Sequence, residues 1–205
     1  MTQKTNKIKE AVLKNITQVI LIVFSVVLGL YLSERIEDNK NKKEAIKLLS
    51  KIKSELKENK KLLDYWVPYH ESAVKSLDSL TKNELFIEDF IKDNSTLHRI
   101  FSRGTIMGEM PANDAWDIAK SNPLIVNFEY DKLLVLSKIY KQQEATYGSF
   151  STMIELLLSP DLNTKESAKR NLQLFKNQLQ DITHRELQLV RFYNEAEMIL
   201  KYQNN

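Results

Sequence analysis

The side chains that could support chemistry are few, and they are spread along the chain. Asp181 and His184 lie three residues apart, a spacing that could place both on one face of a helix. Di-iron helical sites use two Glu-x-x-His motifs and two further glutamates, whereas this chain has one aspartate variant and no second copy. Cysteine is absent, which excludes thiol catalysis, disulfides and thiolate-bound zinc. We therefore expect no metal ligands and no cofactor.

Motifs for catalysis and nucleotide binding are also missing. The sequence has no phosphate-binding loop, dinucleotide fingerprint, zinc-protease motif or nucleophile elbow. Lys and Arg total 30 against 27 Asp and Glu, and a net charge of +3 is too small to indicate a nucleic-acid-binding protein. The sequence predicts a protein that is not an enzyme, with no catalytic or cofactor-binding residues and no nucleic-acid partner.

Two arginines form the strongest candidate for a binding site. Arg99 and Arg103 are one helical turn apart and precede a glycine-containing loop. Two guanidinium groups on one face can hold an anionic ligand or the carboxylates of a partner protein, and the alternative is an ordinary exposed pair. Trp116, in the short helix predicted after the loop, completes this candidate contact site for an anion or a partner.

Residues 15–33 form an uncharged, strongly apolar segment. From Ile16 to Leu32 it contains twelve Val, Ile, Leu or Phe residues, which favour membrane insertion by roughly 4 to 7 kcal/mol before the polar residues subtract. All of its faces are apolar, which favours a membrane span over a buried core helix. The residues that follow, Tyr31 to Arg35, lack a small-x-small cleavage pattern. An uncleaved signal anchor is therefore favoured over a cleaved signal peptide.

Basic residues flank this segment on both sides, so charge alone does not orient it. The first 14 residues contain four Lys, and residues 34–53 contain seven Lys or Arg. The positive-inside rule would keep both sides in the cytoplasm, but long domains cross the membrane largely regardless of charge. We predict a single-pass protein of the cytoplasmic (inner) membrane, with the N-terminus inside and the C-terminal domain in the periplasm.

Four residues mark a face through which two copies could associate. Ser25 and Gly29 form a small-xxx-small pair inside the apolar segment, and Gln18 lies one heptad before Ser25. Asn59 is a polar interruption of a heptad seam that runs over residues 45–80. We expect the lipid bilayer and other membrane or envelope proteins as partners, together with homo-oligomers formed through the span and the stalk.

Long amphipathic helices account for most of the remaining sequence. His70 lies on the seam of residues 45–80, where either a buried hydrogen bond or a contact between subunits is expected. Leu179 and Leu189 lie on the apolar stripe of the last helix and are expected in the core. Two shorter helices are predicted over residues 84–101, with a candidate break at Asn94 and Ser95, and over residues 112–121. A longer helix is predicted from an N-cap at Asn127 to Pro160. The last helix begins with a capping box of Asn163 and Glu166.

These patterns predict an all-α fold. One N-terminal transmembrane helix continues into a long stalk helix, and an antiparallel helical bundle follows. Four Gly and four Pro in 205 residues disfavour barrels, sandwiches and many-looped α/β enzymes. The predicted divisions are a short basic tail at 1–14, the span at 15–33, a charged stalk at 34–67, and a bundle at 68–205 with an irregular insert near 102–128.

The order of these features resembles an uncharacterised family of small single-span membrane proteins found chiefly in Bacteroidota. The matching stretches are GLYLSERIEDNKNKKEAIKLLSKIKSELKEN and AWDIAKSNPLIVNFEYDKLLVLSKIYKQQ, with Ser33-Glu34-Arg35 where the family pattern has a polar-aromatic stretch. The resemblance implies membrane anchoring and a role that is unknown, and it supplies no catalytic residues.

Two functions follow from this layout. The first is a membrane-anchored helical interaction or scaffold protein, a non-catalytic subunit or accessory of a membrane complex. The alternative is an extracytoplasmic ligand-sensing bundle, with its pocket between Arg99 and Trp116, that acts through a partner. Ligand-dependent thermal stabilisation would favour the second function, and co-purification of a fixed partner would favour the first.

Overall fold

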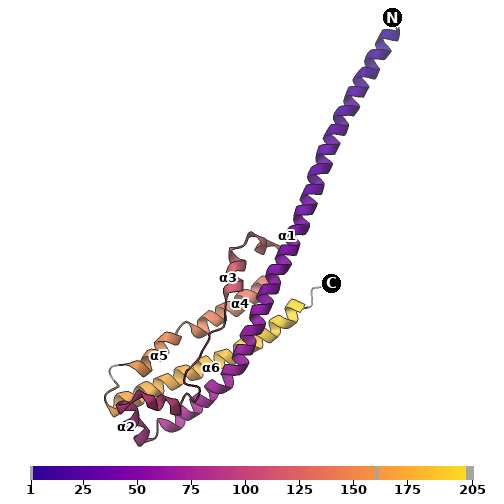
Figure 1. Ribbon diagram of the computed structural model, residues 1–205. Helices are drawn as coiled ribbons and strands as arrows, with labels where there is room; N and C mark the ends of the chain where they lie inside the picture. Colours follow the sequence, from indigo (N-terminus) through magenta and orange to yellow (C-terminus); the bar gives the residue numbers. More distant parts are fainter. Residues whose placement is uncertain (1, 160–161, 202–205) are drawn as a thin grey trace. The chain divides into compact units, whose positions relative to one another are not determined.

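The protein is described by a computed structural model that places the backbone of residues 2–159 and 162–201 (Figure 1). Within these ranges every regular element is helical and no strand is present, which confirms the all-α prediction. The elements are α1 (Thr2–Leu80), α2 (Glu84–Lys92), η1 (Asn94–Arg99), α3 (Asp114–Ser121), η2 (Pro123–Asn127), α4 (Tyr130–Tyr147), α5 (Phe150–Leu158) and α6 (Lys165–Lys201).

The chain divides into two compact units, Met1–Lys47 and Leu48–Asn205. The predicted stalk, residues 34–67, crosses this boundary, because its residues from Leu48 onward pack in the C-terminal unit. Pro68, the first residue after the predicted stalk, lies inside α1, which continues to Leu80 as the heptad seam over residues 45–80 indicates. The domain boundary therefore lies earlier than the sequence indicates.

In the N-terminal unit, α1 is the helix that carries the candidate span. Among the described residues it is the one helix long and apolar enough to cross a membrane, as judged by length and composition, and it lies near the N-terminus. None of the side chains in its most apolar window is buried. Val19 is 59% exposed and Leu30 is 66% exposed, so this surface has no protein covering within the chain.

In the C-terminal unit, α1 contacts α6 at points that follow opposite orders along the two helices. Lys53 donates to the Leu200 carbonyl, His70 pairs with Glu186, and Lys176 pairs with Asp78. The lysines at positions 176 and 82 lower the pKa of Asp78 to about 2 by hydrogen bonding and charge. Helices α4 and α5 also lie along α6 (Figure 1).

The core of this unit is built from the apolar stripes of these helices. Leu179 and Leu189 are 0% exposed, which confirms the predicted phase of the last helix. Leu179 belongs to one hydrophobic cluster with buried aromatic and aliphatic residues of α1, α2, α5 and α6, among them Leu77, Phe86, Phe90, Met153, Leu172 and Phe175. The packing thus joins the C-terminal part of α1 to the second half of the chain.

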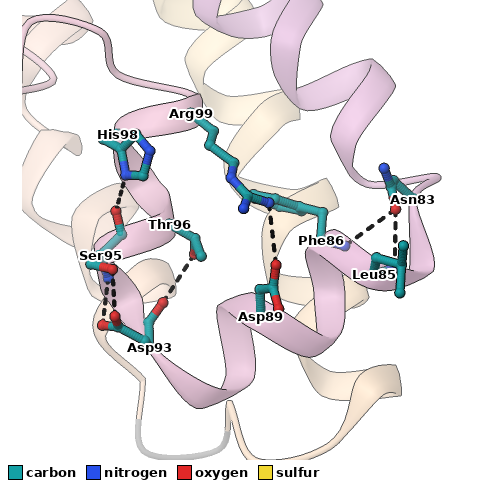
Figure 2. Close-up of polar contacts among 9 residues, drawn as sticks. All are labelled: Asn83, Leu85, Phe86, Asp89, Asp93, Ser95, Thr96, His98 and Arg99. Atoms are coloured by element: carbon teal, nitrogen blue, oxygen red, sulfur yellow. Dashed lines mark hydrogen bonds and ion pairs between the residues drawn. The ribbon is translucent and has the colours of Figure 1, made fainter.

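Several helix boundaries differ from prediction, and local hydrogen bonds explain most of them. The helix expected over residues 84–101 ends at Lys92, because Asp93 is extended and its side chain accepts from Ser95 (Figure 2). An aspartate side chain that binds the backbone two residues later competes with helix formation. This break precedes Asn94, one residue earlier than the candidate break.

The helix expected from Asn127 to Pro160 is interrupted at Gly148. Glycine has low helix propensity, and a Cβ at this position would lie 3.0 Å from the Glu144 carbonyl oxygen. Asn127 ends η2, so Glu129 rather than Asn127 is the N-cap of α4. The helix before Pro160 ends at Leu158, and Pro160 itself lies outside the described residues.

The start of α6 also differs from prediction. Thr164, rather than Asn163, caps this helix, because its Oγ1 accepts from the Ser167 backbone N–H at 3.2 Å. The predicted partner Glu166 lies in the first turn of α6, where its charge favours the positive end of the helix dipole.

We predict that Leu179→Ala lowers the free energy of unfolding by about 2–5 kcal/mol, because it leaves a cavity in a fully buried site. Leu187→Ala is the matched control, since Leu187 lies on the same helix and is 39% exposed. Its expected effect is less than about 1 kcal/mol. Urea unfolding of both variants measures the difference, and equal losses of stability would contradict the described packing.

Candidate functional site

A set of buried polar side chains binds the main chain of the segment between η1 and α3, residues 100–113, which we call the η1–α3 segment. Asn59 donates to the Ala112 carbonyl at 2.7 Å and accepts from the Ala112 N–H at 2.8 Å. Gln143 donates to the carbonyls of Pro111 at 2.9 Å and Ala112 at 3.0 Å. Tyr193 donates to the Gln143 amide oxygen at 2.8 Å. Helices α1, α4 and α6 therefore meet around one short stretch of backbone.

His70 and Glu186 form a second part of this network and are both 0% exposed. The His70 Nδ1 lies 2.8 Å from Glu186 Oε2, and its Nε2 lies 2.9 Å from the Ile106 carbonyl oxygen. The Tyr147 hydroxyl donates to the other Glu186 oxygen at 2.9 Å. Burial, followed by the Glu186 charge, raises the pKa of the Tyr147 phenol. Both imidazole nitrogens and both carboxylate oxygens thus have partners within the chain.

A third part of the network holds the start of α3. Glu55 accepts from the Tyr140 hydroxyl at 2.6 Å and from the Ala115 backbone N–H at 2.7 Å. An N–H in the first turn of a helix has no partner within the helix, so Glu55 supplies one from α1. Trp116 stacks on Tyr140 with ring centroids 5.4 Å apart, and only 7% of Trp116 is exposed.

Arg103 packs on aromatic rings of α1. Its guanidinium carbon lies 3.9 Å from the Tyr65 ring centroid, 4.7 Å from that of Tyr69 and 5.5 Å from that of Trp66. Its Nη1 donates to the Tyr65 carbonyl at 3.3 Å. Tyr69 in turn donates to the Thr105 carbonyl at 2.7 Å. Cation–π contacts and these two hydrogen bonds therefore fix the beginning of the η1–α3 segment on α1.

The predicted site of Arg99, Arg103 and Trp116 is not assembled. Figure 2 shows Arg99 directed at Asp89, and the two charged groups lie 3.4 Å apart. Arg103 lies beyond the end of η1 and binds α1, while Trp116 is buried against α4. Among the described residues, no contact joins any two of these three side chains. The spacing argument assumed one helix through Arg103, whereas the regular structure ends at Arg99. Binding of an anion or a partner by these residues stays a prediction.

The predicted association residues fall into two groups. Asn59 is 3% exposed and bonded to its own chain, so it is not available to a second copy, and His70 is likewise an internal contact. In the candidate span, the Ser25 hydroxyl donates to the Leu21 carbonyl at 2.8 Å, and Gly29 has open space around it. Gln18 is exposed on the same helix. Helix association through Gln18, Ser25 and Gly29 stays a prediction.

Two further features bear on binding. An open cleft of about 510 Å³ lies between α3 and α4, with Trp116, Tyr140 and Tyr147 among its lining residues and Lys120 and Glu144 among its charged ones. No group of three or more His, Asp or Glu residues that could hold a metal ion occurs in the part of the chain searched, which is limited to the described residues. Asp181 pairs with Arg185 instead, at 2.8 Å.

The network itself was missed by the sequence analysis, although one signal was present. Gln143 and Glu186 lie at core-facing positions of otherwise apolar helix stripes, as do Asn59 and His70. A polar residue in such a position requires a hydrogen-bond partner. The pattern could have indicated that these side chains act together, but not that their partner is loop backbone.

No family model, curated protein or solved structure matches this chain.

We predict that His70→Ala lowers the free energy of unfolding by about 3–5 kcal/mol, because it leaves the Glu186 carboxylate buried without its main partner. His184→Ala is the matched control: His184 is exposed on α6, and a change within about 0.5 kcal/mol is expected. A double-mutant cycle with Glu186→Gln should give a coupling free energy of about 1 kcal/mol or more. Equal effects of the two histidine variants would contradict the buried pair.

Proposed function

We propose that this protein is a single-pass membrane protein whose C-terminal unit is an antiparallel helical bundle that binds another membrane or envelope protein. In this function it serves as a non-catalytic subunit or accessory of a membrane complex. The observation that carries the proposal is the uncharged surface from Ile16 to Leu32, which is exposed along its whole length in a chain that packs a separate core.

The exposed surface is too apolar to remain in water. Soluble monomers rarely leave large contiguous apolar patches uncovered, and this segment presents apolar side chains on every face of the helix. Transfer of the segment to the bilayer is favourable by roughly 4 to 7 kcal/mol before the polar residues subtract. A helical backbone satisfies its own hydrogen bonds, as a lipid environment requires.

The bundle arrangement is supported by the order of the cross-helix contacts. Partners of α1 at residues 53, 70 and 78 lie at residues 200, 186 and 176 of α6, which is the order expected of antiparallel neighbours. Contacts of α1 with α4 instead follow the same order in both helices, since Glu55 bonds Tyr140 and Asn59 bonds Gln143. A three-helix core with α6 antiparallel to the other two accounts for all of these pairs.

A non-catalytic role in a membrane complex is supported by the way the polar residues of the bundle are used. The bundle's polar core residues are occupied within the chain, and no catalytic set of acid, base and nucleophile is among the residues brought together. Self-association, where it occurs, uses the span through Gln18, Ser25 and Gly29. The C-terminal unit lies in the periplasm in this proposal, because long domains cross the membrane largely regardless of their charge.

A second candidate function is extracytoplasmic ligand sensing through a partner protein. The cleft of about 510 Å³ between α3 and α4 favours it, since ligand sites are concave and combine aromatic walls with a few polar groups. Thermal stabilisation of the protein by a ligand that Trp116→Ala abolishes would support this function over the first.

We predict that the full-length protein fractionates with membranes and that Val23→Arg with Val27→Arg prevents it. Each arginine at the centre of a span costs about 2.5–3.5 kcal/mol, so two offset the whole insertion free energy. Ile36→Arg is the control, since Ile36 is also exposed on α1 but lies beyond the span.

A reporter active only outside the cytoplasm, fused after Asn205, should be active. If the wild-type protein is recovered in the soluble fraction, the anchor is refuted. If a reporter active only in the cytoplasm is active when fused after Asn205, the orientation is refuted.

A further inference from the structure

A pocket of about 330 Å³ opens between α1 and α6 in the C-terminal unit. Leu56, Tyr193 and Leu200 form its apolar walls. Its size is at the lower end of small-molecule sites, which suits a compact head group and a few carbon atoms rather than a large ligand. We call it the lysine pocket, because three lysines of α1 also line it: Lys53, Lys57 and Lys60.

The lysine charges are only partly neutralised. Lys60 pairs with Asp64 at 3.1 Å. Lys53 is half-buried and donates to the Leu200 main-chain carbonyl, a neutral group, and Lys57 has no ion pair among the described residues. Burial, followed by the charge of Lys132, lowers the pKa of Lys53. Two ammonium groups therefore line the pocket without an acidic partner for either.

One acid, Glu197, is also part of the lining, and it lies on the exposed side of α6. The neighbouring cation Lys132 is already paired with Glu129 at 3.1 Å. The lining thus holds three cations against one carboxylate, next to apolar walls. An anion placed here would gain charge-assisted hydrogen bonds and shield the half-buried ammonium from Lys132.

We infer that the lysine pocket binds the anionic head of an amphiphile. A carboxylate or phosphate lies between Lys53 and Lys57, and the first carbon atoms of the tail lie against Leu56 and Leu200. The pocket belongs to the C-terminal unit alone, so the inference stands apart from the membrane anchor. The same chemistry occurs in a free fatty acid and in the head group of an anionic phospholipid.

Lysine acetylation followed by mass spectrometry tests this inference on the full-length protein. The protein is placed in phosphatidylcholine nanodiscs and treated with acetic anhydride, with and without palmitate or its uncharged counterpart hexadecanol. Palmitate at about ten times its Kd should slow acetylation of Lys53 and Lys57 by about tenfold. Lys51 and Lys75, which are exposed on α1 outside the pocket, are internal controls and should react at unchanged rates.

Nanodiscs that contain phosphatidylglycerol and no fatty acid separate the two sources. Protection of Lys53 and Lys57 in these nanodiscs supports a lipid head group, and protection by palmitate alone supports a free carboxylate. Lys57→Gln should abolish the protection of Lys53, whereas Lys75→Gln, which removes the same charge, should not. The inference is overturned if no condition protects Lys53 and Lys57, if all four lysines are protected equally, or if hexadecanol protects as well as palmitate does.

Discussion

Backbone without regular structure needs hydrogen-bond partners wherever it is buried, and that constraint links the helices of the C-terminal unit. Most residues of the η1–α3 segment are exposed, but Ile106, Pro111 and Ala112 lie against side chains of α1 and α4. Asn59, Gln143 and His70 supply donors to this backbone, and Asn59 also accepts from it. In return, the segment satisfies side chains that would otherwise be buried without partners. Among the described residues, no buried side-chain nitrogen or oxygen atom lacks a partner.

This mutual satisfaction occupies polar residues of the α1 seam within the chain. A seam with polar residues at Asn59 and His70 can specify pairing between two copies, but here both residues are used internally. Gly108 lies beside Trp66, where an added Cβ would make ordinary van der Waals contact with the indole at 3.4 Å. The cleft beside Trp116 is lined in part by Tyr140, Gln143 and Tyr147, and the lysine pocket is lined in part by Tyr193. Both openings therefore border the buried network.

The helical periodicity of the sequence predicted more than its polar residues did. Leu179, Leu189 and most of the seam residues are buried as their spacing indicated, because a 3.6-residue repeat determines which face of a helix is covered. The helix ends at Asp93 and Gly148 depend on single side-chain or glycine effects that periodicity does not register. The hydrogen-bond network could not be predicted from the sequence for another reason. Its partners are carbonyls of residues 105–112, and every residue type carries the same carbonyl. The spacing of Arg99 and Arg103 places them on one face only if both belong to the same helix, and the helical structure ends at Arg99.

Amide hydrogen exchange at Ala112 and Ala115 measures whether side chains of α1 hold this backbone in solution. Neither N–H is bonded within a helix; each donates to a side chain of α1, Asn59 and Glu55 respectively. We predict that both amides exchange far more slowly than that of Gly108, whose N–H has no partner among the described residues, and that Asn59→Leu removes the protection at Ala112. Exchange of Ala112 and Ala115 in the native protein as fast as that of Gly108 would contradict this prediction.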